Sequence, residues 1–269
     1  MVYYYKIVFR RVARVLLLLS LLTCGNIAAA TELEGARQLF NIGDYEAAQS
    51  MAVALETADG YILASEAVTA QILLGHFDKP NRPAKEARLL AEKALLIDPN
   101  NLDARLQQGV AFGLETQSTS IMTAWRKKLP VRMYDMIKLL HQDAPDDPRS
   151  HALLGAWHLG IVNEIGEKNA YKWYKANSED GKIYYEMALQ LTEGNTMDDI
   201  VITSNYAAST ILLDDPDYGK QLLSSVLNMT PSNAAETGVQ KRVSELAALS
   251  DNPKAFKKAA KDFLYNRPF

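Results

Sequence analysis

Residues 84–112 constrain the fold of this chain most, because they combine a helix, a helix-breaking turn and the start of a second helix. Small residues at spacings of four and three mark one face of the first helix: Ala87, Ala91 and Ala94. Pro99 disfavours helical backbone at Asp98 and has no amide proton, so this helix ends there. Asn101 can cap the next helix with its side chain. The stretch therefore predicts two helices packed closely across a tight turn.

The same pairing of small residues recurs along the chain. A small residue is followed by another twelve positions later in the pairs Ala36–Ala48 and Ala207–Gly219. Gly109, ten residues beyond the proline of the central turn, lies where the two helices of a pair would cross. This spacing resembles that of the tetratricopeptide repeat (TPR), a helical hairpin that stacks on its neighbours because it cannot bury its apolar face alone.

The resemblance and the helical spacing of apolar residues predict an all-α, TPR-like solenoid of about five helical hairpins with a C-terminal helical cap. No segment shows the alternation of apolar and polar residues that is typical of a strand. The expected hairpins pair residues 36 with 48, 61–74 with 84–97, 102–114 with 131–142, a helix starting at 148 with one holding 181–188, and 207 with 219. The cap is expected at 234–249 and 253–265.

The N-terminal segment has the pattern of a secretory signal peptide. Four basic residues precede an apolar run at 15–22, and three alanines at 28–30 form a small-residue cleavage pattern. We expect residues 1–30 to be removed after Ala30, residues 31–269 to form the solenoid domain, and the protein to be periplasmic or secreted. The apolar run is shorter than the roughly 20 residues of a spanning helix. An uncleaved N-terminal anchor is the alternative.

Cys24 is the only cysteine, and it lies inside the expected signal peptide. The preceding residues resemble a lipoprotein cleavage box, although Thr23 is larger than the residue usual there. Lipidation and an incidental cysteine both stay open. Cleavage after Ala30 would leave a mature chain without disulfides or thiol chemistry.

The charge balance argues against nucleic acid as a partner. The formal net charge is −3, and removal of residues 1–30 lowers Lys plus Arg from 29 to 25 against 32 Asp plus Glu, giving −7. Affinity for phosphate backbones depends on basic surface, so an acidic domain of this kind is a poor nucleic-acid binder.

The three middle hairpins carry extra residues between their two helices, which in a stacked array fall on one edge and should form one lobe. The insertions of the third and fourth hairpins contain four aromatic residues that are candidates for partner binding: Trp125, Tyr171, Trp173 and Tyr174. Exposed aromatic side chains often dominate binding interfaces. The alternative is that the longer loops fold back and these rings pack against the array.

The inner face of the array is a second candidate surface. Its expected residues are mainly apolar: Leu106, Val110, Ala152, Ala156, Leu159 and Ala208. Some tetratricopeptide domains hold a peptide carboxylate with Lys, Arg and Asn at such positions, so this composition argues against a carboxylate clamp. An apolar helix or an extended peptide would fit, unless the protein itself fills the groove.

No constellation of residues indicates catalysis, a metal or a cofactor. His151 and His158 are seven residues apart, too far to share an ion on one helix, so we interpret them as capping or solvated. Paired aspartates at 146–147, 198–199 and 214–215 fall at expected helix starts and are interpreted as caps. The chain has no G-x-S-x-G, phosphate loop or H-E-x-x-H motif.

The last helix carries four lysines on one face: Lys254, Lys257, Lys258 and Lys261. They form either the solvated exterior of a cap or a weak contact with anionic lipid. Together these patterns predict a non-catalytic scaffold of the bacterial envelope that binds a protein or peptide. The alternative is a ligand-binding or enzymatic protein with its site among the aromatic insertions.

Overall fold

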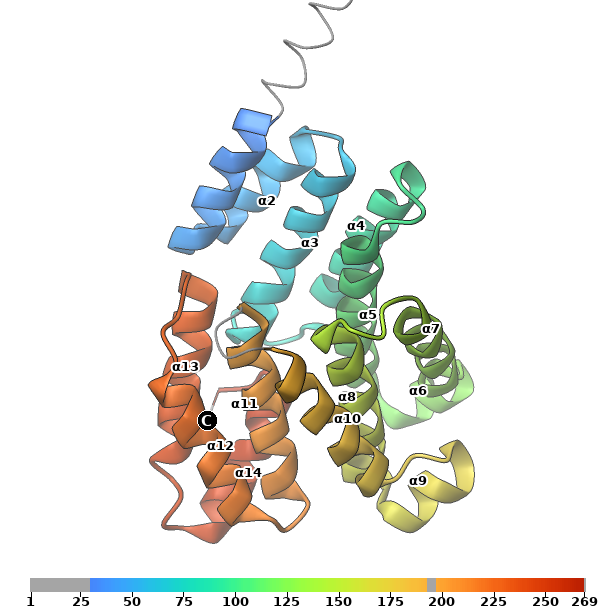
Figure 1. Cartoon of the computed structure of the whole chain (residues 1–269), viewed down its shortest axis with the longest axis vertical. Coiled ribbons are helices and arrows are strands. Elements are labelled where there is room, and N and C mark those ends of the chain that lie inside the picture. The colour runs from blue at the N-terminus through green and yellow to red at the C-terminus, as the bar shows by residue number, and fades with distance from the viewer. Residues whose placement is uncertain (1–29, 193–196, 269) are drawn as a thin grey trace, which may run out of the picture.

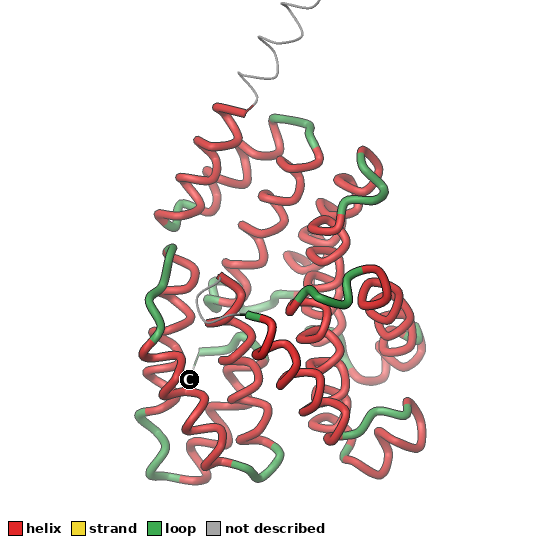
Figure 2. Tube along the Cα trace, in the orientation of Figure 1, coloured by secondary structure: helices red, strands yellow, loops and turns green. Residues whose placement is uncertain are grey.

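The computed structural model describes residues 30–192 and 197–268, and all regular structure in these ranges is helical (Figures 1 and 2). The predicted all-α array of helical hairpins is confirmed. The expected signal peptide and Cys24 fall in residues 1–29, outside the described residues.

Five successive hairpins account for most of the helices. They pair residues 30–42 with α2 (Tyr45–Ala54), α3 (Ala58–Leu73) with α4 (Asn81–Ile97), α5 (Leu102–Gln117) with α7 (Leu129–Asp143), α8 (Pro148–Ile165) with α10 (Ser178–Leu191), and α11 (Met197–Leu212) with α12 (Pro216–Asn228). Helices α13 (Ala234–Ala247) and α14 (Pro253–Leu264) follow at the expected cap. Two short helices occupy the insertions of the third and fourth hairpins: α6 (Ile121–Arg126) and α9 (Glu167–Tyr174).

Polar side chains fix where the helices begin. Asn101 Oδ1 accepts a hydrogen bond from the Ala104 N–H at 3.0 Å, so the predicted cap of α5 is confirmed. At the start of α13, Asn233 Oδ1 accepts from the Glu236 N–H at 3.0 Å, while the Glu236 carboxylate accepts from the Ser232 N–H at 2.6 Å. These bonds satisfy amides that have no partner within the helix.

The hairpins are close-packed where small residues meet. Ala87, Ala91 and Ala94 are fully buried on α4, which packs against α3 and α5. The crossing of α8 and α10 is tighter. A Cβ added to Gly155 would lie 2.6 Å from Tyr185 Cδ2 and 3.0 Å from the carbonyl oxygen of Gly181. Only glycine allows the two backbones to approach this closely.

The end of the array closes onto its beginning, which the sequence patterns did not predict. Leu74, at the end of α3, packs against both the N-terminal and the C-terminal core clusters. A Cβ on Gly238 of α13 would lie 2.3 Å from Leu74 Cδ2, and one on Gly43 would lie 3.1 Å from Ala234 Cβ. Helix α13 therefore begins at the turn of the first hairpin and passes the end of α3 (Figure 1). Helices α13 and α14 both pack on α11, and residues of both helices line the interior of the array.

Candidate functional site

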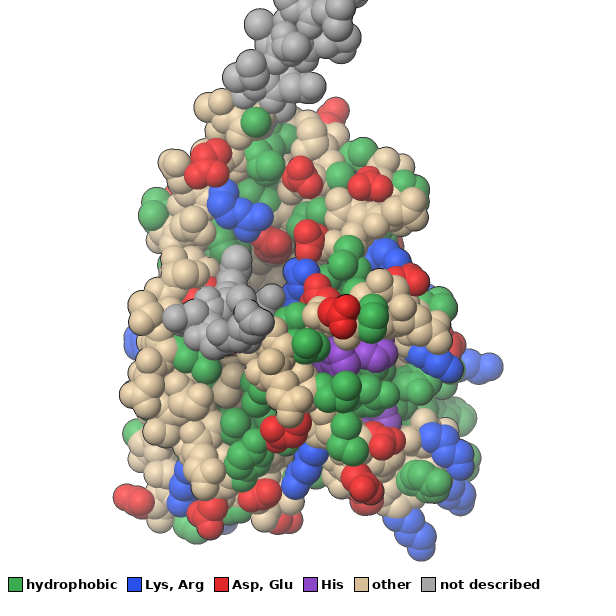
Figure 3. Space-filling model, in the orientation of Figure 1, with side chains coloured by type: hydrophobic (Ala, Val, Ile, Leu, Met, Phe, Trp, Pro, Cys, Tyr) green, Lys and Arg blue, Asp and Glu red, His purple; other side chains and the backbone are tan. Residues whose placement is uncertain are grey.

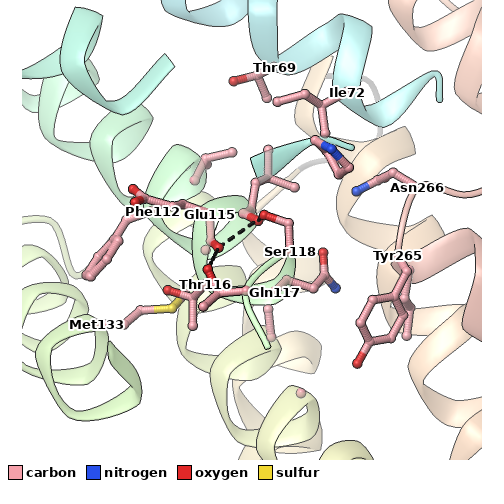
Figure 4. A pocket seen from close by; sticks show the side chains of 18 of the residues that line it. Thr69, Ile72, Phe112, Glu115, Thr116, Gln117, Ser118, Met133, Tyr265 and Asn266 are labelled. Carbon is pink, nitrogen blue, oxygen red and sulfur yellow. Dashed lines mark hydrogen bonds between the residues drawn. The ribbon is translucent and has the colours of Figure 1, made fainter. Parts of the chain in front are cut away.

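The closed array surrounds a groove with a volume of about 2360 Å³, here called the central groove. Its lining comes from α3, α5, α8, α11, α13 and residues 264–268, and includes residues of α4, α6, α7 and α9. Figure 4 shows side chains from distant parts of the sequence around this space, with Thr69 and Ile72 of α3 facing Tyr265 and Asn266 across the end of α5. The groove thus depends on the closure of the array.

One face of α8 forms a strip of small residues along the groove. Ala152, Ala156 and Gly160 recur every four residues and all line it. Arg149 and Glu164 line the groove near the two ends of the strip. A Cβ at Gly160 would have no neighbouring atom within 4 Å, so the space in front of the strip is open.

The predicted inner-face residues divide into accessible and buried positions. Val110 lines the groove half-buried, and Ala156 lines it exposed. Leu106 borders the groove but is 2% exposed, and Leu159 is fully buried. The inner-face assignment of Leu159 is wrong, because its side chain turns toward Gly181 of α10 instead of the groove. Ala208 is likewise fully buried.

Charged pairs also stand at the wall of the groove. Arg37 donates to the carboxylate of the lining residue Glu66 at 2.5 Å, and Arg149 pairs with Asp103 at 2.9 Å. Burial raises the pKa of Glu66, and the positive charge of Arg37 opposes this rise. Arg149 also pairs with Asp147 at 2.7 Å. Arg37 and Arg149 are therefore already paired with carboxylates. The wall of the central groove is more polar than the apolar residues expected from the sequence indicated.

A further part of the lining is organised around Phe112 of α5. The guanidinium carbons of Arg88 and Arg132 lie 5.9 Å and 5.6 Å from its ring centroid. Arg88 is held by the carboxylate of Glu115 at 2.6 Å and by that of Glu92. Cation–π contacts of this kind orient a guanidinium group and leave the ring flanked by positive charge.

The aromatic lobe comprises α6 with the following Lys127 and Lys128, and α9 with the following Lys175. Three of the four predicted aromatic residues are exposed there: Trp125 at 65%, Trp173 at 64% and Tyr171 at 56%. Tyr174 is half-buried and packs against the middle core cluster. Both helices lie on the same side of the molecule (Figure 1), and Trp125 and Trp173 both border the central groove. Buried Ala124 and Ala170 anchor them.

The histidines of α8 are buried, so their interpretation as solvated is wrong. His151 Nε2 donates to the carbonyl oxygen of Pro145 at 2.7 Å, and within the described structure its Nδ1 has no hydrogen-bond partner. His158 Nδ1 accepts from the Asn177 N–H at 3.3 Å. The rings of His141 and His151 are 4.4 Å apart. Burial lowers the pKa of both His141 and His158.

These histidine rings belong to an aromatic cluster at the junction of α7, α8 and α10. The Tyr184 ring lies 5.9 Å from His141 and 5.7 Å from His158. Trp157 packs beside His158 and donates its Nε1–H to the carbonyl oxygen of Pro130 at 2.9 Å. The cluster joins three helices of the array and is a packing element.

The four lysines of α14 are exposed on one face, as predicted. Lys257 pairs with Asp214 at 2.6 Å, and Lys258 pairs with Asp262 at 2.7 Å. The apolar residues Phe256 and Phe263 of the same helix are buried. This face of α14 therefore carries positive charge that two aspartates partly neutralise, and it exposes no large apolar side chain.

No three His, Cys, Asp or Glu side chains in residues 30–192 and 197–268 are placed to hold a metal ion. None of the helices described there is long and apolar enough to cross a bilayer.

Neither a scan against protein-family models nor a search of curated proteins finds a match to this chain. The fold and groove define an all-α hairpin array with a wall of mixed polarity.

Proposed function

We propose that this protein is a non-catalytic scaffold that binds an extended peptide or a helix of another protein in the central groove. The observation that carries the proposal is the open strip of Ala152, Ala156 and Gly160 along α8. Small side chains let the backbone of a ligand approach a helix closely, and a groove can hold an amphipathic helix or an extended peptide.

Polar groups beside the strip support an extended or helical ligand. Gln107 Nε2 donates to Thr69 Oγ1 at 2.9 Å, and both side chains line the groove between α3 and α5. Amide and hydroxyl groups of this kind can hydrogen-bond a peptide backbone without selecting its charge. The resemblance of the hairpins to tetratricopeptide repeats supports the same role. The signal-like N-terminal sequence supports a location in the bacterial envelope as part of this proposal.

Blocking the groove at Gly160 tests the proposal. The chain carrying Gly160→Trp would fill the strip, because a side chain built from this position enters space with no neighbouring atom within 4 Å of its Cβ. Gly160→Ala is the matched control, since it changes the same helix position and leaves the groove open. Both proteins, immobilised at equal amounts, would be exposed to an envelope extract. We expect the alanine form to capture the partner and the tryptophan form to lose it.

A second arm examines the edge of the groove. Trp173→Ala removes an exposed ring of the aromatic lobe without touching the core. Reduced capture would extend the proposed site to α9. Equal capture by the Gly160→Trp and Gly160→Ala forms, with circular dichroism showing both folded, would refute the groove as the binding site.

A further inference from the structure

We propose that the aromatic lobe docks the protein on the surface of a lipid bilayer that contains anionic lipids. Trp125 and Trp173 of the lobe also border the central groove, but lipid binding does not require a peptide there. The inference rests on the combination of unpaired positive charge and exposed aromatic and aliphatic side chains on α6 and α9.

The lobe is strongly basic, although the whole chain has a formal net charge of −3. It carries six cationic residues: Arg126, Lys127, Lys128, Lys168, Lys172 and Lys175. All six are exposed, and none has an ion-pair partner in the described part of the chain. The one acidic residue, Glu167, accepts a hydrogen bond from the Ser178 N–H at 3.0 Å. Figure 3 shows Lys and Arg side chains gathered on this side of the molecule.

Exposed apolar groups accompany these charges on both helices. Ile121, Met122 and Trp125 are exposed on α6, at 60%, 73% and 65%. On α9, Lys172 Nζ lies 4.8 Å from the Trp173 ring centroid, and Lys175 Nζ lies 4.8 Å from that of Tyr171. Tryptophan and tyrosine favour the interface between headgroups and acyl chains, where lysine and arginine reach lipid phosphates. Each helix therefore presents both parts of an interfacial anchor.

The arrangement favours a bilayer over an acidic protein. Helix α6 packs on α7 and α9 packs on α8, so the two anchors project from separate neighbours and repeat the same chemistry. A fluid surface can receive two such projections at once, whereas a protein interface depends on central rings fitted into a shaped pocket. The α14 lysines fit less well, because two of them are paired with aspartates and their helix exposes no large apolar side chain.

The chain from Thr31 onward suits the test, because it keeps every residue of the four core clusters and lacks the apolar N-terminal run. Its tryptophan fluorescence would be recorded with phosphatidylcholine vesicles and with vesicles of phosphatidylcholine and phosphatidylglycerol at about three to one. Trp157 is buried, so a shift of emission would come from Trp125 and Trp173. We expect a blue shift with the anionic vesicles, weakened by salt, and none with phosphatidylcholine alone.

Flotation of the vesicles would measure the contribution of charge. We expect the double variant Arg126→Glu with Lys172→Glu to lose binding by about tenfold or more, since each cation near an anionic surface contributes to the affinity. The control, Lys241→Glu with Lys254→Glu, has the same change of net charge at exposed sites on α13 and α14. It should bind within about twofold of the unmodified chain, because screening limits the effect of distant charges. Circular dichroism would verify that both variants are folded.

Three outcomes would overturn the inference. The first is that the unmodified chain does not float with anionic vesicles. The second is that the control loses binding as much as the lobe variant, which would move the contact to α14 or make it non-specific. The third is that soluble polyglutamate binds the lobe while the vesicles do not, which would identify an acidic polypeptide as its partner.

Discussion

Arg242 of α13 donates a hydrogen bond from Nη1 to the carbonyl oxygen of Leu73, 169 positions earlier in the chain, at 3.1 Å. Its Nη2 donates to the carbonyl oxygen of Arg267 at 2.9 Å, and its guanidinium carbon lies 5.4 Å from the Phe263 ring centroid. One side chain thus joins the end of α3, α13 and the C-terminal residues. These contacts hold the array closed around the central groove.

Arg242→Met should therefore destabilise the protein while keeping most of the apolar stem. We expect the free energy of unfolding to fall by about 1.5–3 kcal/mol, because the Leu73 and Arg267 carbonyls lose a charged donor. Urea denaturation would measure this. The neighbouring exposed Lys241→Met is the control and should change stability by less than about 0.5 kcal/mol. Equal effects of the two changes would show that the closing contacts are not stabilising.

The two glycines of α8 should respond in opposite directions to alanine. Gly155→Ala places a methyl group 2.6 Å from Tyr185 Cδ2, so α8 and α10 must separate, at a cost of about 1–3 kcal/mol. Gly160→Ala meets no atom within 4 Å and gains helix propensity, up to about 1 kcal/mol. Thermal unfolding monitored by circular dichroism would compare them. A stabilising Gly155→Ala would contradict the tight crossing.

The tryptophans should differ sharply in their effect on folding. Trp157 is 4% exposed and donates a hydrogen bond to Pro130, so Trp157→Ala should lower the free energy of unfolding by about 3–5 kcal/mol. Trp173 is 64% exposed, so Trp173→Ala should change it by less than about 0.5 kcal/mol. Denaturant titration measures both. A large loss of stability in Trp173→Ala would support packing of the lobe against the array.

Stability should fall as the pH drops through the range in which histidine titrates. Burial lowers the pKa of His158, with Asp180 opposing, and protonation at Nδ1 would remove the acceptor of the Asn177 N–H. As the pH falls below about 6.5, His158 is protonated more readily in the unfolded chain than in the folded one, so the free energy of unfolding decreases. Well above about pH 6.5 the histidine is neutral in both states and does not affect stability. One such group contributes a slope of at most about 1.4 kcal/mol per pH unit.

His158→Gln should flatten that slope, because glutamine can accept the same hydrogen bond without titrating. Urea denaturation at several values between about pH 7.5 and pH 5 would measure the slopes of both proteins. Burial and the neighbouring His151 lower the pKa of His141 as well. Part of the pH dependence of stability should therefore remain in the variant. Identical slopes would show that His158 does not contribute.

The hairpins could be predicted from sequence because their determinants are local. Pro99, Asn101 and the alanines of α4 specify where helices end, begin and cross within a window of a few residues. Gly155 and Gly181 meet at the crossing of α8 and α10 but are 26 positions apart in the sequence, so their contact is not a local determinant of this kind. Helices α6 and α9 fell in the expected insertions, but their residues did not indicate that two further helices would form.

The closure of the array and the polar wall of the groove could not be predicted in this way. Arg242 and Gly238 have no sequence feature that points to Leu73 and Leu74, because the contact depends on the summed curvature of all the hairpins. Glu66 likewise resembles a residue of a solvated helix face. Its pairing with Arg37 follows only from the packing of the first two hairpins. The burial of Leu159 against Gly181 likewise follows only from the packing of α8 on α10.

The position of residues 265–268 on the wall of the groove has a practical consequence. Any polypeptide fused after Pro268 would emerge beside the proposed ligand channel and could compete with its natural occupant. Affinity handles for capture experiments therefore belong ahead of Thr31, at the far end of the first hairpin from that opening (Figure 1).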